Sequence, residues 1–158
     1  MNRSDFQELA EPHLQHARAL LDARLYSGAF YMCGYAVECA LKACICKRTK
    51  EFDFYRWPDE SRDAWSHDFQ RLIKAAGLES ELDKARASDR DLDVNWKSAG
   101  NWRPRSRYER KTTEETYALF AAISDTDHGV LSCIKRFWQK PTILRTEDRQ
   151  FPRSKTQA

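Results

Sequence analysis

The stretch that decides the fold is Tyr26-Ser-Gly-Ala-Phe-Tyr-Met-Cys-Gly-Tyr-Ala-Val-Glu-Cys-Ala-Leu-Lys-Ala43. With 100° between successive residues of a helix, its apolar side chains gather on one face. That face consists of Phe30, Cys33, Gly34, Val37, Leu41, Cys44 and Ile45. A helix that is apolar on nearly all sides belongs in the middle of a bundle. We therefore expect an all-α protein, an up-and-down bundle of four to five helices with this helix at its centre.

A polar strip adjoins the apolar face of this helix, and it consists of Tyr31, Tyr35, Glu38 and Lys42. Glu38 and Lys42 are four residues apart, so their side chains meet on the helix surface. In a central helix such a pair is partly buried and must be hydrogen-bonded. Two interpretations are open: the strip lines a groove that binds a ligand, or the pair is structural and fixes the helix register.

The opposite side of the same helix carries small residues: Ala36, Cys39, Ala40 and Ala43. Small side chains allow another helix to approach closely, either within one subunit or between two subunits. We expect a homodimer, and this face would allow close helix packing either inside the subunit or at the dimer interface.

The composition describes one globular domain of 158 residues, with 41% hydrophobic and 32% charged residues. No run approaches the roughly 20 apolar residues of a membrane span, and the first residues lack the apolar core of a signal peptide. We expect a cytoplasmic protein without a membrane partner. The five cysteines have no spacing of a metal site, so they are expected to be reduced core residues. No metal and no cofactor are expected, and no Gly-rich phosphate loop is present.

The rest of the chain divides into further helices and one polar end. Expected helices cover about residues 4–25, 28–50, 67–76, 79–87 and 112–139. Capping-box signatures mark two helix starts, at Ser4 and Thr112, and Ser66 is expected to cap the helix from residue 67. The segment 89–110 is expected to be irregular. The helical domain thus spans residues 1–140, followed by a polar tail, residues 141–158.

Asp127 falls inside the apolar stripe of the expected last helix. If this helix is continuous, its phase predicts that Asp127 contacts Lys42 or Arg107 across the bundle. A kink near Gly129 would instead place Asp127 outside.

Basic residues are concentrated between residues 97 and 111, and Glu109 is the one acidic residue in this segment. They are Lys97, Arg103, Arg105, Arg107, Arg110 and Lys111. Arginine and lysine bind phosphate, and an aromatic side chain such as Trp96 or Trp102 can stack on a base. This segment is therefore a candidate nucleotide- or RNA-binding loop. The structural alternative is a solvated loop that its aromatics pin to the core, with its arginines paired to Asp89, Asp91 and Asp93.

Several segments resemble the HEPN domain family of helical proteins. They are 17–21, Tyr26, Ala29, Tyr31, and Gly34-Tyr-Ala-Val-Glu-Cys-Ala-Leu-Lys-Ala43; then Ser66-His-Asp-Phe69 with Leu72; and Trp102 with Arg107-Tyr108. The resemblance covers roughly residues 5–139, and the central helix is its strongest part. It adds Tyr108 to the polar cluster formed by Tyr31, Tyr35, Glu38, Lys42 and Asp127.

The resemblance implies a helical bundle that is commonly dimeric. Some members are metal-independent ribonucleases that act as toxins or in antiviral defence, others pair with a small nucleotidyltransferase, and others are non-catalytic nucleotide- or RNA-associated modules. The ribonucleases use an Arg-x(4–6)-His motif that leads into the last helix. Here no histidine follows Arg103, Arg105 or Arg107 at that spacing, whereas Arg62 and His67 have it before the third helix.

Three functions remain open from the sequence. The first is a non-catalytic HEPN-like module that binds a nucleotide, RNA or a nucleotidyltransferase partner in a toxin–antitoxin or defence setting. The second is a metal-independent endoribonuclease in which His67 accepts the 2′-hydroxyl proton and Arg62 holds the phosphate. The third is a structural dimerisation protein.

Overall fold

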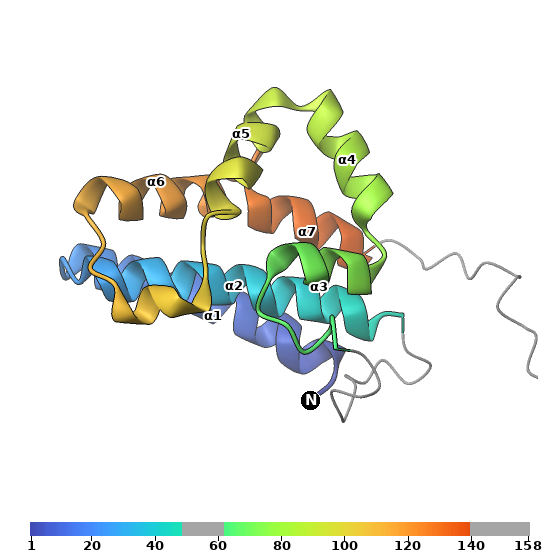
Figure 1. The fold of residues 1–158 in the computed structure, drawn as a ribbon, viewed down its shortest axis with the longest axis horizontal. Helices are drawn as coiled ribbons and strands as arrows, with labels where there is room; N and C mark the ends of the chain where they lie inside the picture. Colours follow the sequence, from blue (N-terminus) through green and yellow to red (C-terminus); the bar gives the residue numbers. More distant parts are fainter. Residues whose placement is uncertain (49–61, 140–158) are drawn as a thin grey trace, which may run out of the picture.

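The computed structural model describes residues 1–48 and 62–139, and within these residues the chain forms helices and no strand (Figure 1). The helices are α1 (Arg3–Asp22), α2 (Tyr26–Cys46), α3 (Phe69–Ala76), α4 (Glu79–Ser88), α5 (Arg90–Ala99), the 3₁₀ helix η1 (Pro104–Tyr108), α6 (Thr113–Ser124) and α7 (Val130–Gln139). The all-α prediction is confirmed. The expected tail at residues 141–158 lies outside the described residues.

Helix α2 is the central element of the bundle, as its apolar pattern predicts. It contacts α1, α3, α6, α7 and η1. Figure 1 shows α1 and α2 running side by side, with α6 and α7 in a second layer above them and the short helices α4 and α5 beyond that layer. Because α2 is covered on several sides, its residues from Ala36 to Cys46 are all buried.

The small face of α2 is used inside the subunit. Ala36, Ala40 and Ala43 are fully buried, and Cys39 is nearly so. Since this side is already covered by the chain itself, it offers no surface to a second copy. A homodimer would have to form through another face.

Helix starts follow the expected chemistry, but not always at the expected residue. Asn2, not Ser4, caps α1 and forms a capping box with Asp5. Asp68, not Ser66, caps α3 by accepting hydrogen bonds from two backbone N–H groups. The capping box of Thr112 with residue 115 is confirmed at α6. In each case a side-chain oxygen satisfies an N–H group that lacks a partner in the first helical turn.

Two expectations about the second half of the chain are wrong. The segment expected to be irregular contains α5, whose first turn is capped by Asp89 at 2.9 Å from the Leu92 nitrogen. The long last helix is interrupted after Ser124, and α7 starts at Val130. Asp125 accepts hydrogen bonds from two backbone N–H groups in the turn. Gly129 lies against the backbone of Asp125, and a Cβ at residue 129 would be 2.1 Å from the Asp125 carbonyl oxygen.

By length and composition alone, α2 could cross a membrane. However, 78% of its most apolar window is buried inside the bundle. The core helix of a soluble protein passes the same test, so this feature is weak evidence for a membrane span.

Candidate functional site

A buried carboxylate lies at the centre of the polar strip on α2. Glu38 is 3% exposed, and its Oε1 lies 2.8 Å from the ammonium nitrogen of Lys42 one helical turn away. His67, just before α3, places its Nδ1 3.0 Å from each carboxylate oxygen. Both neighbours of this nitrogen are acceptors, so Nδ1 carries the proton. The predicted Glu38–Lys42 pair is confirmed, and His67 is its third member.

The Glu38 arrangement fixes the orientation of the His67 ring. Nδ1 is engaged with the carboxylate, while the side chain as a whole is 51% exposed. The other ring nitrogen, Nε2, is therefore left to act as an acceptor or, when protonated, as a donor. A buried carboxylate behind an exposed imidazole is an arrangement that can bind an anion or transfer a proton.

Toward the N-terminal end of α2 the strip continues through two tyrosines. The Tyr31 hydroxyl donates to the Tyr35 hydroxyl at 2.9 Å. Burial, followed by this hydrogen bond, raises the pKa of Tyr35 above its ordinary value. Tyr31 is the first cause of a raised pKa for the guanidinium of Arg107 in η1. The expected polar strip is thus a continuous row of polar side chains with a cation at one end.

Trp102 forms the apolar support beneath this row. Its indole is 1% exposed and lies directly on Gly34, where a Cβ would be 1.9 Å from Trp102 Cε2. The ring stacks on Phe69 with centroids 5.3 Å apart and meets Tyr35 edge-on at 5.7 Å. Trp102 therefore connects α2, the start of α3 and the segment that leads into η1.

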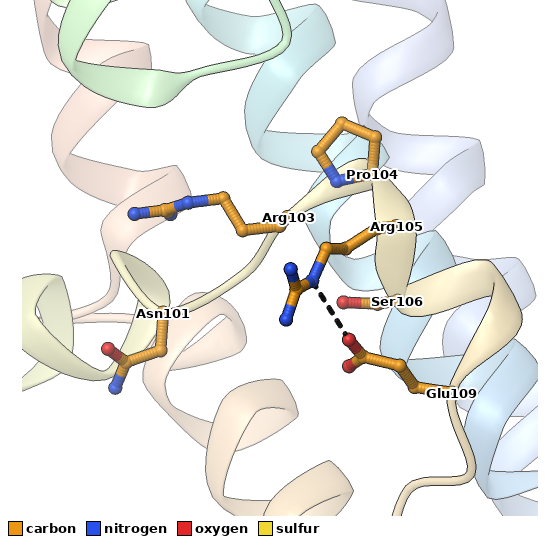
Figure 2. Close-up of a pocket in the computed structure, with 6 residues that line it drawn as sticks. All are labelled: Asn101, Arg103, Pro104, Arg105, Ser106 and Glu109. Atoms are coloured by element: carbon orange, nitrogen blue, oxygen red, sulfur yellow. Dashed lines mark hydrogen bonds and ion pairs between the residues drawn. The ribbon is translucent and has the colours of Figure 1, made fainter.

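A pocket of about 520 Å³ lies beside η1 (Figure 2). It is lined by Asn101, Arg103, Pro104, Arg105, Ser106 and Glu109. In Figure 2 the side chains of Asn101, Arg105 and Glu109 surround the same hollow, and Arg103 extends along its upper side. Its two arginines supply several N–H donors in a confined space.

The basic segment is only partly neutralised by its own residues. Glu109 pairs with Arg105 at 3.1 Å and with Lys111 at 2.8 Å. Arg103 donates to the carbonyl oxygens of Gly100 and Trp102 at 2.5 and 2.7 Å. Of the acids expected as alternative partners of the arginines, Asp93 binds Arg86 and Lys97 of the same segment, and Asp89 binds His128. One carboxylate thus serves two cations.

A comparison with known protein families decides the identity of the bundle. A sequence model of the HEPN domain matches residues 4–127. The chain belongs to the HEPN domain family. Searches of curated proteins and of solved structures found no match. The family match ends within the turn before α7, so the HEPN domain match includes α2, His67 and η1.

Within this HEPN domain, the two residues predicted as a ribonuclease pair have different surroundings. Arg62 is exposed in a turn, and no hydrogen bond or ion pair joins it to His67 among the described residues. The spacing in sequence is present, but the nearest charged group to the imidazole is the carboxylate of Glu38. His67 therefore belongs to the polar cluster.

Three other assignments to the HEPN site are corrected by the fold. Trp102 is buried and cannot stack on a ligand base. Asp127 is exposed in the turn after α6, as the alternative with a break near Gly129 predicts, because the helix that would have turned it inward ends at Ser124. Tyr108 is 79% exposed, and the guanidinium of Arg107 lies 4.8 Å from its ring centroid. Arg110 is exposed, as expected of a loop cation.

The sequence analysis did not assign His13 to the site. His13 of α1 is half-buried, and its ring centroid lies 6.0 Å from that of Tyr35. Among the described residues, its buried Nδ1 has no hydrogen-bond partner. Burial, and then the nearby His16, lower the pKa of His13. The only sequence signal was its position between the apolar residues Ala10 and Ala17 of α1, three residues after one and four before the other.

Proposed function

We propose that this HEPN domain is a non-catalytic module that binds a phosphate-bearing ligand, a nucleotide or RNA, at the pocket beside η1. The observation that carries the proposal is that Arg103 and Arg105 line one pocket together with Asn101. Guanidinium groups bind phosphate through two parallel hydrogen bonds, which gives both strength and orientation.

The size and charge of the pocket support this ligand class. A volume of about 520 Å³ falls in the range of roughly 300–1,000 Å³ for small-molecule sites. Glu109 shares its carboxylate between Arg105 and Lys111. A bound phosphate can therefore take the place of Glu109 at Arg105 while Glu109 keeps Lys111.

The binding experiment compares the wild type with an Arg103→Ala/Arg105→Ala variant at two salt concentrations. Labelled RNA and mononucleotides serve as probes. The matched control is Arg71→Ala/Arg90→Ala, which removes the same charge from exposed positions on α3 and α5. We expect the affinity of the wild type for these probes to fall steeply as salt rises. At a given salt concentration, the Arg103→Ala/Arg105→Ala variant should bind more weakly than the wild type, and the control variant should not. An equal loss in both variants would leave a diffuse charge effect as the explanation.

A second candidate function is a metal-independent endoribonuclease, and the Glu38–His67 contact is the observation in its favour. A carboxylate at 3.0 Å from Nδ1 leaves Nε2 as a base that can accept a proton from a 2′-hydroxyl. In this form the activity would depend on Glu38 and His67 and not on Arg62. The test is an RNA cleavage assay in the presence of a chelator, with wild type, His67→Ala and Arg62→Ala. If the wild type does not cleave RNA, the ribonuclease function is ruled out.

Family membership also motivates three proposals about assembly: a homodimer, a nucleotidyltransferase-type partner, and a cytoplasmic toxin–antitoxin or defence setting. A structural dimerisation protein is the remaining alternative. Light scattering of the purified chain tests the dimer. Copurification with a nucleotidyltransferase encoded beside this chain tests the partner. A stable dimer that binds no RNA or nucleotide would favour the structural alternative.

A further inference from the structure

We propose that Tyr108 is the stacking platform for the base of the ligand whose phosphate occupies the η1 pocket. The ligand class is then a free nucleotide or one nucleotide unit of single-stranded RNA, not a bare polyphosphate. This inference rests on the proposed function and deepens it.

The exposure of Tyr108 is the first observation. Tyr108 is 79% exposed, whereas Trp96 and Trp102 in the same part of the chain are 4% and 1% exposed. A base can stack only on a ring that solvent can reach, so the tryptophans are excluded. Tyr108 supplies a planar ring with a polar hydroxyl, which suits contact with a nucleobase.

The register of η1 places Tyr108 one helical turn after a residue that lines the pocket. In a 3₁₀ helix, side chains at positions i and i+3 eclipse each other, about 6 Å apart along the axis. Arg105 lines the pocket, and Tyr108 is the residue three positions later in the same helix. The two side chains therefore emerge from the same side of η1, with the phosphate-binding group one turn before the aromatic ring.

Arg107 supports the ring from behind. Its guanidinium carbon lies 4.8 Å from the Tyr108 ring centroid, within cation–π distance. Tyr31 of α2 is the first cause of a raised pKa for the same guanidinium. Arg107 thus occupies one side of the ring and adds positive charge there, while the high exposure of Tyr108 leaves surface available for a base.

The element that carries both groups is fixed before any ligand binds. Ser106 is 2% exposed, and Trp102 is seated on Gly34 immediately before η1. Pro104 at the start of η1 restricts the backbone further. A platform held in place in the free protein loses little conformational freedom on binding.

The experiment separates base recognition from phosphate recognition. Isothermal titration at one low salt concentration uses three probes: ATP, inorganic tripolyphosphate, and a single-stranded RNA of ten nucleotides. The variants are Tyr108→Ala, Tyr108→Phe, Arg105→Ala, and the control Tyr117→Ala, which removes another exposed tyrosine, on α6. Because Tyr108 is exposed, its replacement is not expected to disturb folding, and circular dichroism checks this.

We expect Tyr108→Ala to weaken ATP or RNA binding about tenfold, with tripolyphosphate unchanged and Tyr108→Phe close to the wild type. Arg105→Ala weakens all three probes. A loss with ATP identifies a free nucleotide as a ligand, and a loss confined to RNA identifies a strand. If the wild type binds the probes and Tyr108→Ala binds ATP and RNA as tightly as the wild type does, Tyr108 is not a stacking platform, whereas the proposed phosphate site stands. If the wild type binds none of them, both proposals are wrong.

Discussion

The indole of Trp102 lies against the backbone of Gly34, at the one place in the middle of α2 where no side chain intervenes. A Cβ at residue 34 would be 1.9 Å from Trp102 Cε2 and 2.1 Å from Cδ2. These are atoms of a buried ring that also stacks on Phe69, so the indole has little freedom to retreat. This contact fixes η1, and hence the pocket, against the central helix.

The first prediction concerns this contact. Gly34→Ala is expected to lower the free energy of unfolding by about 3 kcal/mol, because overpacking in a core costs roughly 1–3 kcal/mol and the overlap here is severe. Urea denaturation measures the change. Gly28→Ala, in the same helix, is the matched control, since its Cβ would meet Leu20 at an ordinary 3.5 Å. Gly28→Ala is expected to be neutral or stabilising. If both variants lost the same free energy of unfolding, the close contact between Gly34 and Trp102 would be contradicted.

The second prediction concerns the buried ion pair. Lys42→Met leaves the carboxylate of Glu38 without the cation at 2.8 Å, and Glu38→Leu removes this carboxylate from the buried ammonium of Lys42. Each is expected to destabilise the fold by about 3–5 kcal/mol. The double variant should regain much of this loss, because neither charge then remains buried. Thermal and urea unfolding of the four proteins forms a double-mutant cycle, and additive losses would show that the two charges do not depend on each other.

The sequence predicts the contact between Glu38 and Lys42, which are close in the chain, but not the contact of Glu38 with His67. The Glu38–Lys42 pair follows from helical spacing once α2 is recognised as the central helix. His67 lies 29 residues beyond Glu38 in the chain, and no local pattern brings it to the carboxylate. The resemblance to the HEPN family singled out both segments, but their contact is a tertiary fact.

The aromatic and acidic assignments failed for a different physical reason. Trp102 and Tyr108 both stand among arginines in the sequence, and nothing local distinguishes a core ring from an exposed one. The missing side chain of Gly34 makes room for Trp102, and that room is visible only in the fold. Asp127 was placed by extending one helical phase across residues 125–129, whereas Asp125 closes a turn there.

The third prediction concerns pH and the contact between His128 and Asp89. Nδ1 of His128 lies 2.9 Å from Asp89 Oδ2, and this hydrogen bond is the main reason that the pKa of His128 is raised. Asp91 and Asp125 act in the same direction. A group with a raised folded-state pKa contributes stability that is complete below its unfolded pKa, about 6.5, and that is lost as pH rises through the folded pKa.

We therefore expect the difference in unfolding free energy between wild type and His128→Gln to be larger at pH 5.5 than at pH 8.5. Asp89 is ionised at both pH values, because hydrogen bonds from the Leu92 backbone and from His128 lower its pKa. His16→Gln serves as the control, since His16 is exposed. A difference that is the same at both pH values would show that the imidazolium–carboxylate contact does not stabilise the folded state.

The fourth prediction concerns Glu109, the carboxylate that faces the pocket. Glu109→Gln keeps the shape of the side chain but releases Arg105 and Lys111 from their ion pairs. If the pocket binds phosphate, affinity for ATP should rise several-fold, because the ligand no longer competes with an internal anion and meets a more positive site. Glu114→Gln, an exposed residue in the first turn of α6, changes the net charge equally. A similar gain in both variants would point to net charge alone, whereas a gain confined to Glu109→Gln places the phosphate beside Arg105.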